Sequence, residues 1–342
     1  MKTNTLVLAA ALLCGLSPLL HAADKPVARV SLFSWPGYGF WFIAKEKNLA
    51  PDIDLDIQII EDPYESYAQM SAGQLDITSS TAEYGPIAAD AATGVKLVSY
   101  TNPSTGTDKI IVAPDIKEPA DLKGKEVAVL EGGLTQIFMA MWLEKNGVKF
   151  DDVKYVNVVM DDAVAAMVSG KVAAGEFWEP FGGQVLKSLK GSRVVTNSDE
   201  PAWRQTALLG DAMYMSTAFL EKNPETAQKA MKAYWDAVAW WKENPAEGNE
   251  IIAKAIKFEV SDVEDVIGKG TGAGIYVFDL PEAAKFMGVL PGHPPLGMAN
   301  GQINEQWKLT SDWWLRFGLI KKEHPIEAGV SFEPLKSLAE AE

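Results

Sequence analysis

The chain has 342 residues, of which 47% are hydrophobic and 23% are charged, and its formal net charge is −15. Such an acidic surface repels nucleic acid and anionic lipid, so neither is expected as a partner. Cys14 is the single cysteine, which excludes a disulfide-held scaffold and requires an ordinary buried core. The length suits two domains of ordinary size.

The N-terminal residues 1–22 have the layout of a cleaved secretory signal peptide. Lys2 provides a short basic start, residues 6–20 are apolar, and Ala22 ends the segment with a small residue. The apolar stretch is too short for a convincing membrane span. Leu13 precedes Cys14 and does not fit the small residue that lipoprotein processing requires, so lipidation is not expected. We therefore expect export, with cleavage after Ala22 or one residue later.

An aromatic loop, Ser34–Trp41, follows directly on the strand-like run 28–33. Its rings offer flat apolar walls, and Gly37 and Gly39 let backbone N–H groups come close to a bound group. A strand that ends in such a loop and then a helix places the loop at the carboxyl edge of a sheet, where open α/β folds bind ligands. The loop therefore predicts half of a pocket; the alternative is that its aromatic residues are core anchors.

Strand-like runs alternate with amphipathic stretches through the first two thirds of the chain. Strands are expected at 28–33, 55–60, 75–79, 95–100, 108–112, 125–130, 154–159, 172–177 and 193–196. Helices are expected from about residue 64 to 72 and from about residue 83. Such alternation is typical of parallel sheets, here divided between two lobes.

From about Thr217 the pattern changes to helices that are expected to pack around the first lobe. Asn223-Pro224 and Asn244-Pro245 each open one helix, and Val260–Asp262 caps a third. The Pro-bearing stretch from Ala113 and the segment near 209 would mark the two passages between the lobes, which together form a hinge.

Five short motifs carry a resemblance to a known family. They are Gly73–Ile77, Asp121–Val129, Gly170–Ala174 running into Trp178–Phe181, Trp240–Pro245 and Phe317–Lys322. In these motifs the chain resembles periplasmic solute-binding proteins of ABC importers, in the group that binds nitrate, aliphatic sulfonates, taurine and thiamine-precursor pyrimidines. The resemblance covers nearly the whole chain after the signal peptide.

This resemblance implies an α/β fold of two lobes, like a type II periplasmic binding protein, with a ligand cleft and a two-stranded hinge. It assigns 23–113 and 210–342, with the C-terminal helices, to the first lobe and 114–209 to the second. It implies ligand capture without catalysis, no cofactor, no metal, a membrane permease as partner, a monomer and a periplasmic location. An enzyme on the same fold, such as a hydrolase or a pyrimidine-transforming synthase, is the alternative, and a sensing role at a membrane receptor also stays open.

The candidate ligand-binding residues lie on loops at the expected strand ends. They are Trp35, Tyr38, Ser80, Thr81, Glu83, Asp108, Glu131, Thr135, Glu176, Phe177, Asp211 and Tyr214. We expect the rings of Trp35 and Phe177 to sandwich the ligand, while the carboxylates of Glu83, Asp108 and Glu176 fix its polar groups. Members of the resembled family often carry an acidic residue where this chain has Ala173, and here the carboxylate appears later, as Glu176.

Several of these residues also have structural interpretations. The segment Glu131–Gln136 opens a helix whose N–H groups can hold an anion, but capping explains it equally well. Glu83 can stabilise the first turn of its helix, Asp108 can cap a strand, and 211–214 can pack in the hinge. Asp151-Asp152 and Asp161-Asp162 are interpreted as solvated helix starts.

The motifs of the common enzyme classes are missing. His293 and His324 lie far apart, so neither a zinc site nor a histidine-based triad can be assembled after signal removal. The glycine-rich stretch 268–274 lacks the ending of a phosphate-binding loop.

The candidate cleft residues are mostly acidic, and only four arginines follow the signal peptide: Arg29, Arg193, Arg204 and Arg316. We therefore expect a cationic or neutral polar nitrogen compound, such as a guanidinium or amine, as the ligand. A flat cation would also gain from the aromatic rings. The alternative is taurine, an aliphatic sulfonate or a thiamine-precursor pyrimidine, held by N–H groups and hydroxyls.

Overall fold

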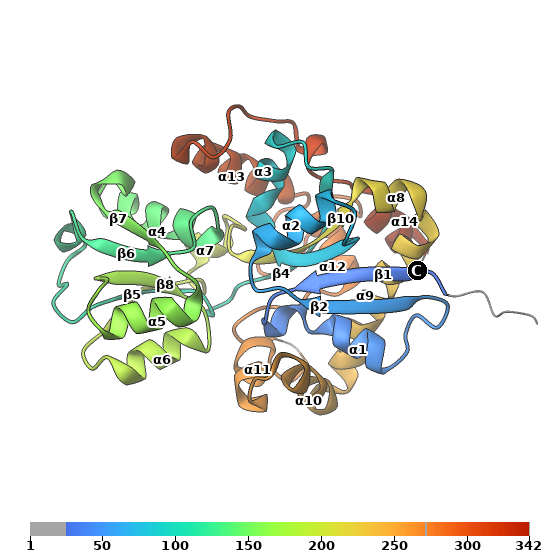
Figure 1. Ribbon diagram of the computed structural model, residues 1–342, viewed down its shortest axis with the longest axis horizontal. Helices are drawn as coiled ribbons and strands as arrows, with labels where there is room; N and C mark the ends of the chain where they lie inside the picture. Colours follow the sequence, from blue (N-terminus) through green and yellow to red (C-terminus); the bar gives the residue numbers. More distant parts are fainter. Residues whose placement is uncertain (1–24, 271, 342) are drawn as a thin grey trace, which may run out of the picture.

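The computed structural model describes residues 25–270 and 272–341. The predicted signal peptide and its cleavage site lie outside these residues. The described chain forms two bodies, each built on a five-stranded sheet with helices on its faces (Figure 1). Within these residues, no helix is both long and apolar enough to cross a membrane.

The first lobe is built on a sheet with the strand order β2-β1-β3-β10-β4. Its strands are β1 Val27–Leu32, β2 Asp54–Ile59, β3 Ile77–Thr81, β4 Val95–Pro103 and β10 Gly210–Ser216. β1 runs parallel to β2 and β3, whereas β10 runs antiparallel to both of its neighbours. The carboxyl ends of β1 and β3 therefore lie at the same edge of the sheet as the start of β10.

The second lobe repeats this plan with the strand order β7-β6-β8-β5-β9. Its strands are β5 Lys109–Val112, β6 Glu126–Val129, β7 Lys154–Asn157, β8 Ala174–Phe177 and β9 Arg193–Asn197. β6 is parallel to β7 and β8, and β5 is antiparallel to β8 and β9. The expected purely parallel sheets are thus mixed, because the strand that follows each passage between lobes inserts in the opposite direction.

The first passage between the lobes lies earlier than Ala113. Since β4 ends at Pro103 in the first sheet and Lys109 already pairs in the second, the chain crosses between these two residues. It returns before Gly210, where β10 begins in the first sheet.

Helices cover both sheets. Those around the first sheet are α1 Phe40–Glu46, α2 Pro63–Ser71, α3 Gly85–Asp90, α8 Thr217–Lys222, α9 Pro224–Glu243, α10 Pro245–Ile256, α11 Val260–Ile267, α12 Leu280–Phe286 and α14 Glu333–Ala341. Those around the second are α4 Leu134–Lys145, α5 Met160–Val168, α6 Phe181–Ser188 and α7 Pro201–Arg204. α9 and α10 begin at Pro224 and Pro245, as the Asn-Pro pairs predict, since the missing N–H of proline costs nothing in a first helical turn.

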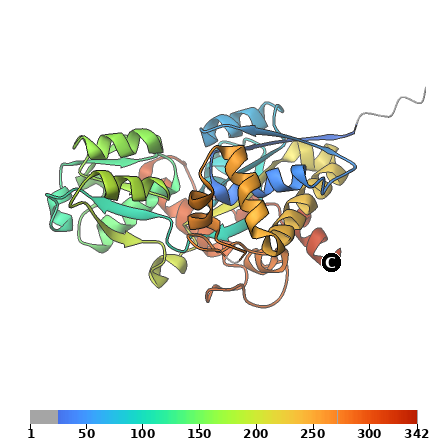
Figure 2. The same cartoon turned by 90° about the horizontal axis from the view of Figure 1, so that it is seen from below.

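One C-terminal helix, α13 Ile303–Phe317, packs against both lobes. Its Trp313 and Trp314 belong to the hydrophobic core of the second lobe, and Arg316 forms an ion pair with Glu144 of α4. Figure 2 likewise shows part of the orange-to-red C-terminal region between the two bodies, whereas the end of the chain, marked C, lies beside the first body. The expectation that the whole C-terminal part belongs to the first lobe is therefore incomplete, because this helix buries aromatic rings on the other side of the cleft.

Candidate ligand-binding cleft

A cavity of about 690 Å³ lies between the facing edges of the two sheets. Its lining contains eight acidic side chains: Glu61, Asp62, Glu83, Asp108, Glu131, Asp161, Asp162 and Asp211. Glu83, Asp108 and Asp211 are buried at 7% exposure or less, and the other five are exposed at the rim. Among the described residues that line the cavity there is no lysine, arginine or histidine. The lining of the cleft is therefore strongly acidic and has no basic group among the described residues.

Asp211, at the start of β10, is held by the aromatic loop that follows β1. The indole Nε1–H of Trp35 donates to its Oδ2 at 2.9 Å, and the hydroxyl of Tyr38 donates to its Oδ1 at 2.8 Å. The turn Pro36–Tyr38 brings both donors to the same carboxylate. Burial raises the pKa of Asp211 to about 7, although these hydrogen bonds act in the opposite direction. Trp35 and Tyr38 thus line the cavity and also position its central carboxylate.

The turn of this loop requires a glycine at position 37. A Cβ atom added to Gly37 would lie 2.6 Å from Nε1 of Trp35 and 2.9 Å from Oδ2 of Asp211. Any side chain would therefore press against the hydrogen bond between these two residues.

Glu83 lies in the short turn Ala82–Tyr84 after β3 and is fully buried. Its Oε1 accepts from the Thr81 hydroxyl and from the backbone N–H of Leu134, each at 2.8 Å. Its Oε2 is buried and has no hydrogen-bond partner. Burial raises the pKa of Glu83 to about 8. Glu83 therefore does more than stabilise its own helix, because it contacts both lobes and the cavity.

Asp108, at the start of β5, is the third buried carboxylate of the lining. Burial raises its pKa, while contacts with Ser104 and Glu176 lower it. Glu176 is also fully buried, and burial together with the charge of Asp108 raises its pKa well above the usual range. Glu176 does not line the cavity, which corrects the expectation that it touches the ligand. It lies near Asp108, and both of its carboxylate oxygens are buried without a hydrogen-bond partner among the described residues.

The expectation that Phe177 contacts the ligand is also corrected. Its ring is fully buried in the core of the second lobe, where a Cβ atom at Gly175 would lie 2.7 Å from it. The predicted sandwich of Trp35 and Phe177 is wrong, since alternate residues of a strand share one face and Phe177 stays with Gly175. Trp178, the next residue in the chain, lines the cavity instead, with its ring centroid 6.4 Å from that of Phe33.

The segment before α4 offers no free anion-binding amides. The N–H groups of Leu130, Glu131 and Gly132 donate to the side chains of Thr135, Asn157 and Gln136, at 2.8, 3.0 and 2.8 Å. The N–H of Gly133 donates to the carbonyl of Leu130 at 3.1 Å, and that of Leu134 donates to Glu83. Five successive amides are thus satisfied within the protein, so the geometry favours the capping interpretation of Thr135 and its neighbours.

The remaining candidates divide into two groups. Thr81 and Glu131 line the cavity, whereas Ser80 and Tyr214 are buried in the first sheet outside its lining. The Tyr214 hydroxyl donates to the carbonyl of Thr81 at 2.7 Å, so Tyr214 supports the strand end without reaching the ligand space.

Asp161 and Asp162 also line the cavity rim, which the sequence argument did not predict for them. They are exposed in the first turn of α5, as expected for a solvated helix start. Their position after β7, at the same edge as the ends of β6 and β8, is the signal that could have identified them.

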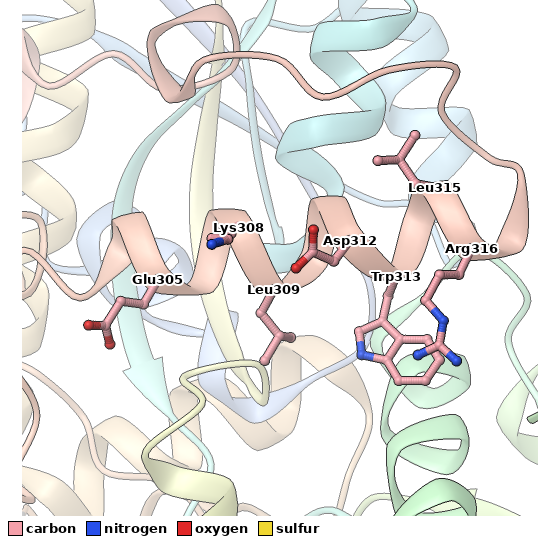
Figure 3. Close-up of a pocket in the computed structure, with 7 residues that line it drawn as sticks. All are labelled: Glu305, Lys308, Leu309, Asp312, Trp313, Leu315 and Arg316. Atoms are coloured by element: carbon pink, nitrogen blue, oxygen red, sulfur yellow. The ribbon is translucent and has the colours of Figure 1, made fainter. Parts of the chain in front are cut away.

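A second hollow of about 670 Å³ lies over α13 (Figure 3). All of its lining residues belong to this one helix: Glu305, Lys308, Leu309, Asp312, Trp313, Leu315 and Arg316. The guanidinium of Arg316 lies 3.9 Å from the centre of the Trp313 ring. This hollow has charges of both signs and takes no side chain from the cleft, so the cleft is the better candidate for a small ligand.

Comparison with known proteins identifies the family. The model of the NMT1/THI5-like family matches residues 35–248, from Trp35 to a point beyond Asp211. The chain belongs to this family. A putative binding protein of Brucella abortus is 26% identical over 273 residues, which cover 77% of this NMT1/THI5-like chain and 82% of that protein. A putative aliphatic sulfonates-binding protein of Escherichia coli is 29% identical over 191 residues, or 55% of this chain and 57% of the relative.

Solved structures confirm the fold of this NMT1/THI5-like protein. The alkanesulfonate-binding protein SsuA of Xanthomonas axonopodis pv. citri, bound to MOPS, has a TM-score of 0.70 at 18% identity, over 91% of this chain and 100% of that one. The desulfurization enzyme DSZB has a TM-score of 0.60 at 16% identity, over 92% of this chain and 99% of that one. The α/β fold predicted from the sequence is therefore confirmed, and the same fold serves both binding proteins and an enzyme.

Proposed function

We propose that this protein is the periplasmic ligand-binding component of an ABC-type importer and that it captures a small cationic or neutral polar nitrogen compound. The observation that carries the ligand class is the lining of the cleft, with eight acidic side chains and no basic one among the described residues. Relatives named as binding proteins and the fold shared with SsuA support the transport role.

The charge of the cleft favours a cation for a physical reason. Glu83, Asp108 and Asp211 are all buried in the lining, and desolvation by burial raises the pKa of each. A ligand with N–H donors and positive charge compensates this cost, because charge-assisted hydrogen bonds to carboxylates are among the strong ones. Guanidinium-like and amine-bearing molecules are therefore the first choices.

The aromatic walls suit a flat cation. In the lining, the ring of Trp178 lies near those of Phe33 and Phe181, and the ring of Tyr64 lies near that of Tyr84. A cation over an aromatic face gains from the ring quadrupole, by about 0.5–2 kcal/mol. The same walls also accept an uncharged nitrogen heterocycle.

Taurine or an aliphatic sulfonate is the rival ligand, because two relatives carry these ligands in their names. A sulfonate would need N–H donors or basic side chains, and the five successive amides that end at the first residue of α4 already have acceptors within the protein. An enzyme is the rival class, because DSZB shares the fold. We infer binding without chemistry, because the relatives that match in sequence are named as binding proteins.

A thermal-shift screen followed by calorimetry tests the proposal. The purified protein is mixed with guanidine, agmatine, butylamine and 4-aminopyrimidine, and in parallel with taurine, methanesulfonate and nitrate. The buffer is phosphate, because common alternatives are themselves amines or sulfonates. We expect a nitrogen compound to raise the melting temperature by mass action. Binding of a sulfonate without any response to nitrogen compounds would contradict the ligand class while leaving the transport role in place.

A further inference from the structure

Glu83 connects the two lobes across the cleft. It belongs to the turn after β3 of the first lobe, yet its Oε1 accepts from the N–H of Leu134, the first residue of α4 in the second lobe. Its own carbonyl accepts from the indole N–H of Trp314 at 2.8 Å, which fixes the turn from behind. The carboxylate is therefore held in place from both lobes and from α13.

The start of α4 is a position where an anion would otherwise bind. The helix has 12 residues, and the N–H groups of a helix start carry partial positive charge. Here the Glu83 carboxylate itself accepts from Leu134, while the four preceding amides donate to other groups of the protein. An anionic ligand would have to displace Glu83 to reach the N–H of Leu134.

The second carboxylate oxygen of Glu83 has a different environment. Oε2 is buried and has no hydrogen-bond partner, and Glu83 lines the cavity. A buried oxygen without a donor is costly unless a ligand supplies one. Oε1 of Glu83 thus accepts hydrogen bonds from within the protein, and Oε2 is available to a ligand that donates one.

We propose that the Glu83 carboxyl group occupies the place of an anion at the start of α4 and so sets the sign of the charge the cleft accepts: one oxygen covers the N–H of Leu134 against anions, and the other, in the ionised form, accepts a donor group of a cation. The part of this proposal that concerns a cationic ligand rests on the proposed function, whereas the exclusion of anions by Glu83 does not depend on it.

Three variants test the proposal. Glu83→Ala uncovers the N–H of Leu134 and removes the acceptor. Asp211→Asn removes a buried carboxylate of the same cleft but leaves the α4 start covered. Glu225→Gln removes one negative charge from the exposed start of α9, away from the cavity. Calorimetry measures the binding of methanesulfonate and of the nitrogen compound that binds the wild type, or of guanidine if none does.

We expect Glu83→Ala to bind methanesulfonate about tenfold or more tightly than the wild type does. Asp211→Asn and Glu225→Gln should show no such gain. Cation binding should fall in both cleft variants and stay at the wild-type level in Glu225→Gln. Equal sulfonate affinity of the wild type, Glu83→Ala and Asp211→Asn would overturn the proposal.

Glu83→Gln keeps the test decisive if the alanine variant does not fold. Its amide oxygen still accepts from Leu134, so the helix start stays covered while the charge is lost. Weaker cation binding without any gain in sulfonate binding supports the proposal. Unchanged cation binding in Glu83→Gln would overturn the role of Oε2. Absence of cation binding to the wild type itself would instead count against the proposed function.

Discussion

The indole N–H of Trp35 donates a hydrogen bond to Oδ2 of Asp211 at 2.9 Å, although 176 positions separate the two residues in the chain. This contact joins the loop after β1 to the first residues of β10, where the chain has just returned from the second lobe. The cleft therefore contains a carboxylate whose orientation depends on an aromatic side chain.

Removal of the Asp211 charge should weaken cation binding. Asp211→Asn keeps the shape of the side chain but replaces a charged acceptor by a neutral one. A hydrogen bond to a charged group is worth about 1.5–3 kcal/mol, so affinity should fall roughly 10- to 100-fold. Calorimetry with the wild-type ligand measures the change. Unchanged affinity would show that Asp211 faces the ligand without binding it.

Trp35→Phe separates the two roles of the indole. Phenylalanine keeps an aromatic ring but lacks the N–H that donates to Asp211. We expect weaker cation binding, by about 1 kcal/mol, because the carboxylate loses a donor that holds it in place. Trp35→Ala, which also removes the ring, should cost about 1–3 kcal/mol. If Trp35→Phe binds as the wild type does, the hydrogen bond has no part in recognition.

Gly37→Ala should impair binding although Gly37 itself does not line the cavity. The new Cβ atom would lie too close to both Trp35 and Asp211, so their hydrogen bond must lengthen or break. Gly182→Ala in α6 is the matched control, because its nearest neighbour would lie at 3.5 Å, an ordinary contact. Calorimetry and thermal unfolding of both variants provide the comparison. We expect loss of affinity in Gly37→Ala alone.

Cation affinity should rise with pH. The pKa values of about 7 for Asp211 and about 8 for Glu83 mean that the empty cleft holds protons at neutral pH. A cation favours the ionised carboxylates, so binding releases protons and becomes tighter as pH increases from about 6 to about 9. Calorimetry in two buffers of different ionisation enthalpy counts the protons. An anionic ligand would show the opposite trend.

Stability of the ligand-free protein should fall as pH rises. The pKa values of Asp211 and Glu83 in the folded chain lie above their ordinary values, so the folded state binds more protons than the unfolded state does. Their contribution is complete at low pH and is lost as pH rises through about 7 to 8. Between about pH 4, the ordinary carboxyl value, and about pH 7, the melting temperature of Asp211→Asn should therefore decline less than that of the wild type. Parallel slopes would show that Asp211 does not titrate in this range.

The sequence by itself determined the local elements and most of the buried acidic residues of the site. Strand runs and Asn-Pro helix starts are local signals, because side-chain alternation and the missing N–H of proline act within a few residues. Glu83, Asp108 and Trp35 were identifiable because each follows or precedes a strand at the edge where open α/β sheets bind ligands. The family resemblance then placed these edges opposite one another.

Only the tertiary structure decided which of these residues meet. The strands β5 and β10 insert antiparallel because the chain has just changed lobes, and no local pattern records this direction. Phe177 and Trp178 are adjacent aromatic residues at a strand end, and only the packing over Gly175 assigns one to the core and the other to the cavity. Glu83 and Leu134 lie in different lobes, so the hydrogen bond that covers the start of α4 exists only when the two sheets face each other.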